Sequence, residues 1–128
     1  MTAAKTLVLV VDDYEDNRLM YAEYLEFCGY RVETAVDGHG AIDKARRLLP
    51  AVIAMDMSLP LLDGWEATRI LKADVATRSI VIIAVTGHSE AMHIARAKVV
   101  GCDHFLTKPF LPQALAKLIE DSLVLLLR

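Results

Sequence analysis

The 128-residue chain has the size of one ordinary domain, and with 55% hydrophobic and 24% charged residues it can bury a core. Its net charge of −3 at pH 7 argues against a surface for a nucleic-acid backbone or an anionic membrane. Two cysteines are too few for a disulfide framework, and no apolar run is long enough to span a membrane. We therefore expect a soluble, cytoplasmic protein.

Short apolar runs alternate along the chain with longer segments of helical period. In chain order we expect a strand at residues 6–11, a helix at 16–28, a strand at 31–35, a helix at 38–49, a strand at 51–55, a helix at 64–73, a strand at 80–85, a helix at 90–100, a strand at 103–106 and a helix at 111–126. Gly29, Pro50 and Gly101 end three of these helices. Asp63 with Glu66 forms a capping-box pattern at the start of the third helix.

This alternation of five strands with five helices predicts an α/β fold with a parallel sheet that is covered on both faces. Right-handed crossovers favour a doubly wound, flavodoxin-like strand order 2-1-3-4-5. We expect one domain over residues 1–128, with its core at about residues 6–126.

Charged and hydroxyl side chains come directly after the predicted strands, where a doubly wound sheet forms its ligand crevice. These residues are Asp12 and Asp13 after the first strand, Asp56 after the third, Thr86 after the fourth and Lys108 just past the fifth. Carboxylates packed together disfavour one another unless a cation compensates their charge. Mg²⁺, which prefers oxygen ligands and often binds together with phosphate oxygens, is the simplest such cation.

Each of these residues also has a simpler interpretation. Asp13 and Thr86 could cap the first and fourth helices, and Asp56 could be an ordinary turn residue. Lys108 and Pro109 could form only a turn before the last helix. The simpler interpretations weaken in combination, because independent caps need not fall at the mouth of the central strands.

The same residues resemble the receiver domains of two-component response regulators. The motifs that carry the resemblance, in the family's order and spacing over nearly the whole chain, are Val11-Asp12-Asp13-Tyr14-Glu15-Asp16-Asn17-Arg18, Gly29-Tyr30, Asp37-Gly38, Asp56-Met57-Ser58-Leu59-Pro60-Leu61-Leu62-Asp63-Gly64, Val85-Thr86-Gly87 and Lys108-Pro109-Phe110.

The resemblance implies that Asp56 accepts a phosphoryl group from a phosphohistidine donor. It implies that Asp13, Asp56 and the backbone carbonyl of Ser58 bind Mg²⁺ directly, and that Asp12 acts through water. It also allows a cis peptide bond between Lys108 and its proline.

The resemblance assigns further roles around the phosphoryl group. Lys108 would pair with its oxygens, while the Thr86 hydroxyl and the backbone N–H groups of Met57 and Gly87 would complete a phosphate cradle. On activation, Thr86 would move toward the phosphoryl group and Phe105, where the family often has tyrosine, would turn inward. The alternative for Phe105 is a core side chain that does not move.

Two more positions border the cradle by analogy. Ser58 and His88 would lie near the water that hydrolyses the acyl phosphate, although a solvent-facing position at a helix start is the simpler interpretation of His88. Trp65 is expected to pack rather than to anchor a partner.

The implied function is a phosphorylation-controlled interaction switch, either a single-domain regulator or an intermediate in a phosphorelay. It is not an enzyme in the usual sense, although it would assist its own phosphorylation and dephosphorylation. The partners would be a sensor histidine kinase or histidine phosphotransfer protein and an unknown downstream protein, with no nucleic acid bound directly and no membrane contact.

Homodimerisation through the last strand and its flanking helices is a further hypothesis, prompted by the apolar tail at residues 123–127. For that tail, the alternative is a fifth helix that is simply longer and better buried.

Three alternatives remain at this stage. The chain could be the receiver segment of a hybrid histidine kinase. A flavodoxin-like cofactor binder would need an uncharged phosphate loop after the first strand, where this chain has two aspartates. A phosphatase of the aspartyl-phosphate type would have an Asp-x-Asp pattern after the first strand, and this chain lacks that pattern.

Overall fold

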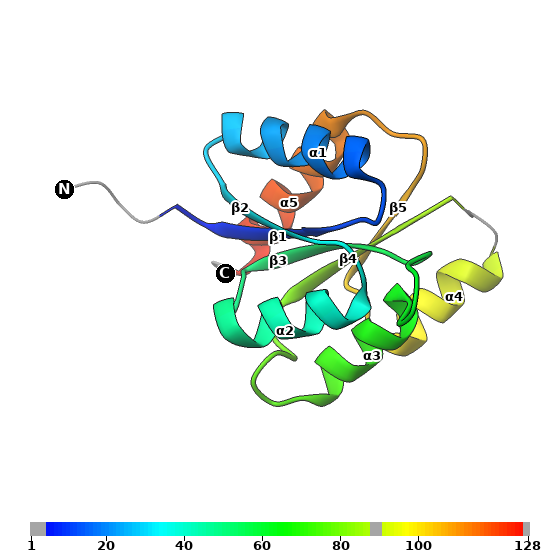
Figure 1. The fold of residues 1–128 in the computed structure, drawn as a ribbon. Coiled ribbons are helices and arrows are strands. Elements are labelled where there is room, and N and C mark those ends of the chain that lie inside the picture. The colour runs from blue at the N-terminus through cyan, green and yellow to red at the C-terminus, as the bar shows by residue number, and fades with distance from the viewer. Residues whose placement is uncertain (1–4, 88–90, 127–128) are drawn as a thin grey trace.

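Five parallel strands form one sheet in the order β2-β1-β3-β4-β5 (Figure 1). The computed structural model describes residues 5–87 and 91–126. The strands are β1 (Leu7–Val11), β2 (Arg31–Ala35), β3 (Val52–Asp56), β4 (Val81–Thr86) and β5 (His104–Thr107). The helices are α1 (Glu15–Phe27), α2 (Gly38–Leu48), α3 (Gly64–Ala73), α4 (Ala91–Val100) and α5 (Pro112–Leu126). The predicted fold class and strand order are confirmed.

The last three strands each end one residue later than predicted, and two of these ends are predicted site residues. Asp56 pairs with Val85 in the sheet ladder, and Thr86 pairs with Thr107. Asp56 and Thr86 are therefore the last residues of β3 and β4 rather than the first residues of the loops that follow. The backbone of both is fixed by the sheet.

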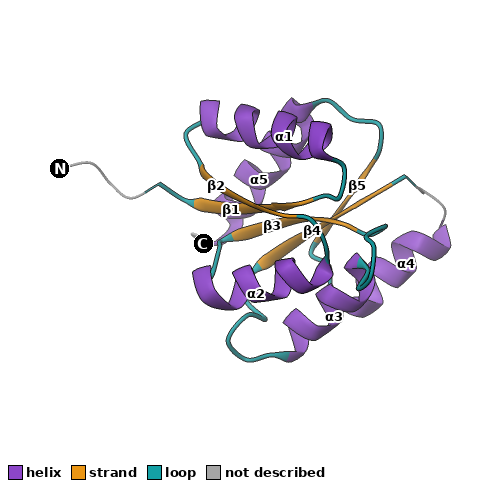
Figure 2. Cartoon of the chain, viewed as in Figure 1, coloured by secondary structure: helices purple, strands orange, loops and turns teal. Residues whose placement is uncertain are grey.

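Helices cover both faces of the sheet, with α1 and α5 on one face and α2, α3 and α4 on the other (Figure 2). The side chains of β1 alternate between the two cores that result. Leu9 and Val11 pack toward α2 and α3, while Val8 and Val10 pack toward α1 and α5. Because the sheet is buried on both sides, its strands have continuous apolar sequences rather than alternating ones.

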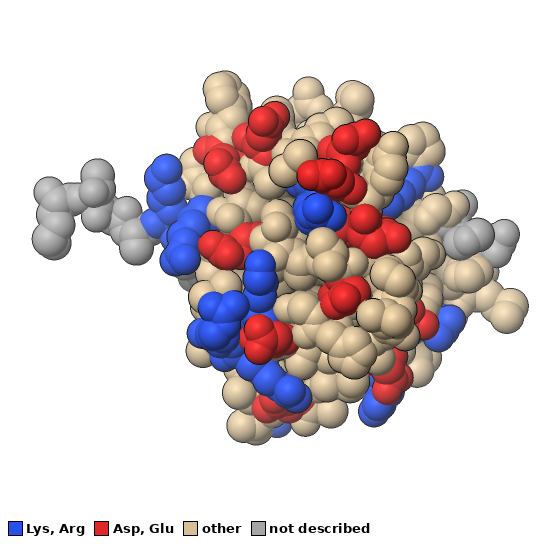
Figure 3. All heavy atoms as spheres, viewed as in Figure 1, with Lys and Arg blue, Asp and Glu red and all other residues tan. Residues whose placement is uncertain are grey.

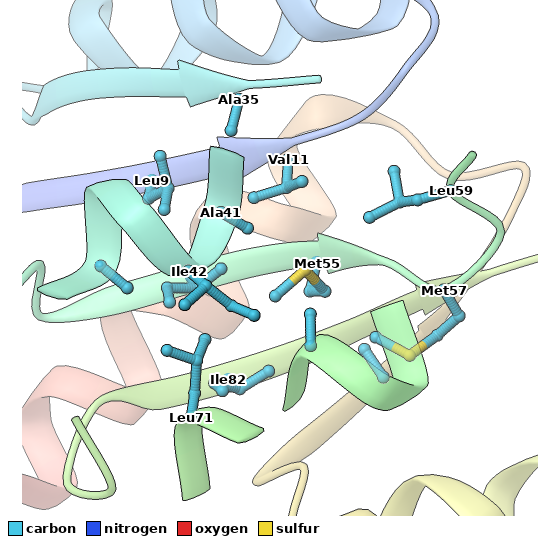
Figure 4. Close-up of a cluster of buried hydrophobic side chains, with 14 of the residues drawn as sticks. Leu9, Val11, Ala35, Ala41, Ile42, Met55, Met57, Leu59, Leu71 and Ile82 are labelled. Carbon is cyan, nitrogen blue, oxygen red and sulfur yellow. The ribbon is translucent and has the colours of Figure 1, made fainter. Parts of the chain in front are cut away.

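The larger core lies between the sheet and α2 and α3 (Figure 4). Leu9, Met55 and Ile82 contribute to it from three neighbouring strands. Ile42 from α2 and Leu71 from α3 close it from the helix side. This packing holds the central strands rigidly beneath the loops at their carboxyl ends.

Local signals at the helix ends are largely confirmed. Gly29 and Gly101, with φ of 102° and 103°, follow α1 and α4 in the left-handed conformation that glycine adopts without strain. Asp63 caps α3 by accepting a hydrogen bond of 2.9 Å from the backbone N–H of Glu66. The reciprocal half of the predicted capping box is wrong, because the Glu66 carboxylate pairs with Arg69 on the next turn instead.

The surface mixes charges of both signs. Figure 3 shows acidic side chains spread over the upper part of the viewed face and basic side chains concentrated on the side from which β1 starts. Among the described residues, none of the helices has the length and apolar character that a bilayer crossing requires.

Some of the expectations concern residues at the edges of the described ranges. In the apolar tail, Leu123 packs partly against the core, Val124 is 48% exposed, and residue 127 lies outside the described residues. His88 and Glu90 also lie outside them. Cys28 is exposed and Cys102 half-buried, and both are free thiols.

Candidate functional site

The predicted site residues meet at the carboxyl edge of the sheet because of the strand register. Val11 pairs with Met55, so the residues that follow them in the chain, Asp12 just after β1 and Asp56 at the end of β3, lie side by side. Lys108 follows β5 directly, and its backbone N–H donates to the carbonyl of Thr86 over 2.7 Å. Residues that are far apart in sequence thus line one edge, as the end-of-strand argument predicts.

Three carboxylates form the centre of the site. Asp12, Asp13 and Asp56 each place a carboxylate oxygen within 4.8 Å of the others. The side chains of Asp12 and Asp56 are buried, with residue exposures of 2% and 5%, whereas Asp13 is exposed. The cluster therefore has two buried carboxylates and one carboxylate that faces solvent. A cation could reach the cluster from that open side.

Lys108 supplies the positive charge that faces the buried pair. Its Nζ lies 3.4 Å from Oδ2 of Asp12 and 3.3 Å from Oδ2 of Asp56. This single ammonium group faces a cluster of three carboxylates, so that acidic groups outnumber it. The peptide bond between Lys108 and Pro109 is cis, which confirms that expectation.

The pKa values of the buried pair follow from this arrangement. Burial raises the pKa of Asp56 above its ordinary value, against the opposing effects of a hydrogen bond from the Ser58 backbone and the charge of Lys108. Burial lowers the pKa of Lys108, but the charges of Asp56 and Asp12 outweigh it, so that the pKa lies above its usual range. Both shifts indicate a site with too much negative charge for its burial, which a divalent cation would correct.

Backbone groups orient the Asp56 carboxylate. The backbone N–H of Ser58 donates to Oδ1 of Asp56 over 2.9 Å, while Lys108 faces Oδ2. Both oxygens are held, so the plane of the carboxylate is fixed. The backbone N–H of Met57, predicted to contact phosphate, donates to the carbonyl of Val85 over 2.9 Å.

The helix-capping interpretations do not fit the structure. The residue before α1 is Tyr14, which makes no side-chain capping bond, so Asp13 is free of that role. Thr86 is buried at the end of β4, and Gly87 directly after it is not helical, so Thr86 does not cap a helix. The simple turn interpretation of Asp56 is wrong as well, because Asp56 belongs to β3.

The expected switch residues lie on neighbouring strands, where Phe105 pairs with Ala84, two residues before Thr86. Thr86 ends β4, and Phe105 lies on the neighbouring β5. Phe105 is half-buried against the core and lines a cavity of about 240 Å³ between α4 and β5. Trp65 is buried in the core with the Arg96 guanidinium 4.6 Å above its ring, in agreement with the packing role expected for it.

Two residues of α1 hold the site in ways that the sequence analysis did not identify. Arg18 Nη1 donates to the backbone carbonyl of Asp12 over 3.0 Å. The ring of Tyr21 stacks on Phe110, with centroids 5.3 Å apart, next to the Lys108 loop. Arg18 stands in a motif quoted for the family resemblance, but its position five residues after Asp13 gave no indication of its partner.

Comparisons with known proteins agree with this geometry. A family model described as "Response regulator receiver domain" matches residues 8–120. The polar-differentiation response regulator DivK of Brucella anthropi is 35% identical over 102 residues, which cover 80% of this chain and 83% of DivK. The structure of the chemotaxis response regulator CheY4 of Vibrio cholerae is similar with a TM-score of 0.88, at 31% identity, and the match covers 93% of this chain and 99% of CheY4.

A third similar structure bears on the metal. It is the receiver domain of the sensor histidine kinase PA1611 from Pseudomonas aeruginosa, described with a magnesium ion coordinated in its active-site cleft. The TM-score is 0.85 at 32% identity, and the match covers 92% of this chain and 97% of that domain.

Proposed function

The chain belongs to the response regulator receiver family, and from that premise we propose that it accepts a phosphoryl group on Asp56 in a Mg²⁺-dependent reaction. The observation that carries the proposal is the cluster of three carboxylates around Asp56, faced by Lys108. We propose that residues 1–128 act as one cytoplasmic receiver domain in two-component signalling.

The residues present fit a magnesium ion. Mg²⁺ binds hard oxygen ligands, keeps several of its waters and commonly uses one or two carboxylates together with phosphate oxygens. Asp13 and Asp56, with the backbone carbonyl of Ser58, would hold the ion directly, and Asp12 would hold it through water. When bound, the ion neutralises charge on the phosphoryl oxygens.

The protein's own contribution to the transfer is position and charge. An oxygen of the Asp56 carboxylate attacks phosphorus, the P–N bond of the phosphohistidine donor breaks, and the imidazole leaves with the electron pair. Lys108 faces the phosphoryl oxygens, while the Thr86 hydroxyl and the backbone N–H groups of Met57 and Gly87 complete the cradle. The Met57 N–H has to exchange the Val85 carbonyl for a phosphoryl oxygen to do so.

We propose that phosphorylation changes a protein contact surface through Thr86 and Phe105. A sensor histidine kinase or a histidine phosphotransfer protein would be the donor, and a downstream protein, or a second copy of this chain, would bind the last strand and its flanking helices. The half-buried ring of Phe105, beside the cavity between α4 and β5, supports a side chain with room to turn inward.

A second candidate role is that of a receiver segment within a hybrid histidine kinase. The similarity to the PA1611 receiver domain, at 32% identity, favours this role. The similarity to DivK and CheY4 favours a single-domain regulator or relay intermediate. The chemistry proposed at Asp56 is the same for each.

The decisive experiment is incubation with acetyl phosphate and Mg²⁺, followed by mass spectrometry of the intact protein. We expect one phosphoryl group per wild-type chain, no addition to Asp56→Asn, and suppression by EDTA. Asp43→Asn, which alters an exposed aspartate on α2, serves as the control and should be labelled like wild type. Labelling of Asp56→Asn would assign the acceptor to another residue.

The raised pKa of Asp56 predicts that the free energy of unfolding of the metal-free protein depends on pH. Between the unfolded and folded pKa values, the folded protein keeps a proton that the unfolded chain has released, so stability falls as pH rises through this window and then levels off. Relative to wild type, Asp56→Asn should therefore become more stable as pH rises from about 4 toward neutrality. Urea unfolding of both proteins in EDTA measures this, and a constant difference across the range would contradict it.

A further inference from the structure

Asp13 is the one exposed carboxylate of the cluster, and the peptide units on both sides of it are held by hydrogen bonds. On its C-terminal side, the backbone N–H of Tyr14 donates to Oδ1 of Asp12 over 2.9 Å. On its N-terminal side, the carbonyl of Asp12 accepts the bond of 3.0 Å from Arg18 Nη1. Because each peptide unit is planar, holding both units sets the direction in which the Asp13 side chain leaves the backbone.

Arg18, which holds the peptide unit before Asp13, is itself held in place. Its own backbone N–H donates to the carbonyl of Tyr14 over 3.0 Å in the first turn of α1, and its side chain is half-buried. Asp12, in turn, is tied to β2 by a bond of 3.2 Å from its backbone N–H to the carbonyl of Ala35. The guanidinium group therefore links two fixed elements, the start of α1 and the end of β1, across the residue that faces solvent.

We propose that Arg18 is a positioning residue that holds Asp13 in place for the metal ion. The inference rests on the proposed function, because it assigns to Arg18 a part in assembling the Mg²⁺ site. Arg18 acts through the Asp12 carbonyl and the peptide plane, and not by touching the ion. Residues that orient metal ligands in this way commonly affect metal affinity strongly.

Because Arg18 is charged, the direction in which Mg²⁺ affinity changes when Arg18 is replaced tests the proposal. A guanidinium group near a cation site repels the cation, so removing the charge by itself would strengthen Mg²⁺ binding. Loss of the hydrogen bond to the Asp12 carbonyl would free the peptide unit before Asp13 and would therefore weaken Mg²⁺ binding. The positioning role and a purely electrostatic role therefore predict changes in opposite directions.

The test is a MgCl₂ titration of the metal-free protein, followed by the NMR shifts of its backbone amides. We expect Arg18→Gln to bind Mg²⁺ about tenfold more weakly than wild type. Arg18→Lys, whose ammonium can still donate to the carbonyl, should recover part of the loss. Arg47→Gln removes an equivalent charge from the exposed face of α2 and should bind like wild type. At saturating Mg²⁺, Arg18→Gln should be phosphorylated by acetyl phosphate at nearly the wild-type rate, so that the defect lies in the Mg²⁺ concentration required.

The outcomes separate this inference from the function on which it rests. Absence of Mg²⁺ binding by the wild-type protein overturns both. Wild-type binding, together with equal or tighter binding by folded Arg18→Gln, overturns the role of Arg18 alone. If Arg18→Gln does not give a folded amide spectrum, Arg18→Met, which keeps an apolar stem but has no donor for the Asp12 carbonyl, decides: weaker binding than wild type supports the role, and equal or tighter binding overturns it.

Discussion

Replacement of Lys108 by methionine is expected to slow phosphorylation of Asp56 about 100-fold at saturating Mg²⁺. The ammonium group lies 3.3 Å from Asp56 and 3.4 Å from Asp12, so it faces the charge that develops during transfer. The same change should strengthen Mg²⁺ binding, because it removes the competing cation from two buried carboxylates. Rates from acetyl phosphate and a MgCl₂ titration measure the two effects separately.

Lys117→Met is the matched control for this prediction. Lys117 is an exposed lysine on α5 that pairs with Asp121 over 2.7 Å, so its loss removes the same charge away from the site. It should leave both the phosphorylation rate and the Mg²⁺ affinity close to wild type. A Lys108→Met protein that is phosphorylated at the wild-type rate would remove Lys108 from the transfer step.

Gly64→Ala is expected to lower the free energy of unfolding by about 3 kcal/mol. Gly64 is the first residue of α3, where alanine would normally favour the helix over glycine by about 1 kcal/mol. A Cβ atom at this position would lie 2.2 Å from the carbonyl oxygen of Asp56 and 2.7 Å from Cα of Met57. Both neighbours are backbone atoms, one of the proposed phosphoacceptor Asp56 and one of the residue after it, so relief of the clash has to move the site loop. Urea denaturation measures the loss.

Gly40→Ala provides the comparison, since Gly40 also lies in the first turn of a helix. A Cβ there would meet a side-chain oxygen of Asp37 at 3.4 Å and the Cβ of Ala35 at 3.5 Å, which are ordinary contacts. We expect this variant to be as stable as wild type or up to about 1 kcal/mol more stable. Equal stability of Gly64→Ala and wild type would show that the loop after β3 can shift without cost.

The repeating pattern of the sequence was sufficient to predict the order and type of all the strands and helices that the structure describes. The reason is that a parallel sheet covered on both faces requires continuous apolar strands, and amphipathic helices between them, whatever the details of packing. The convergence of Asp12, Asp56 and Lys108 followed from the same argument, because the carboxyl ends of parallel strands share one edge.

Contacts between side chains were not predictable from local patterns. The capping box at Asp63 is a local signal, yet the Glu66 carboxylate turned to Arg69, which lies on the exposed side of α3. Arg18 stands in a motif that the sequence analysis quoted, and only its distance to the Asp12 carbonyl reveals what it holds. In each case the partner is set by how the helix packs in the folded chain, which the local sequence does not show.

By itself, the sequence determined the fold class, the strand order and which side chains at the strand ends share one edge of the sheet, because these follow from periodicity and from chain direction. Only the tertiary structure decided that Asp56 and Thr86 end their strands instead of starting the loops, since sheet register sets where a ladder stops. It also set the distances of 3.4 Å and 3.3 Å between Lys108 and two carboxylates that lie 96 and 52 positions away in the chain. Such distances depend on how strands and helices pack together, and no local stretch of sequence contains that information.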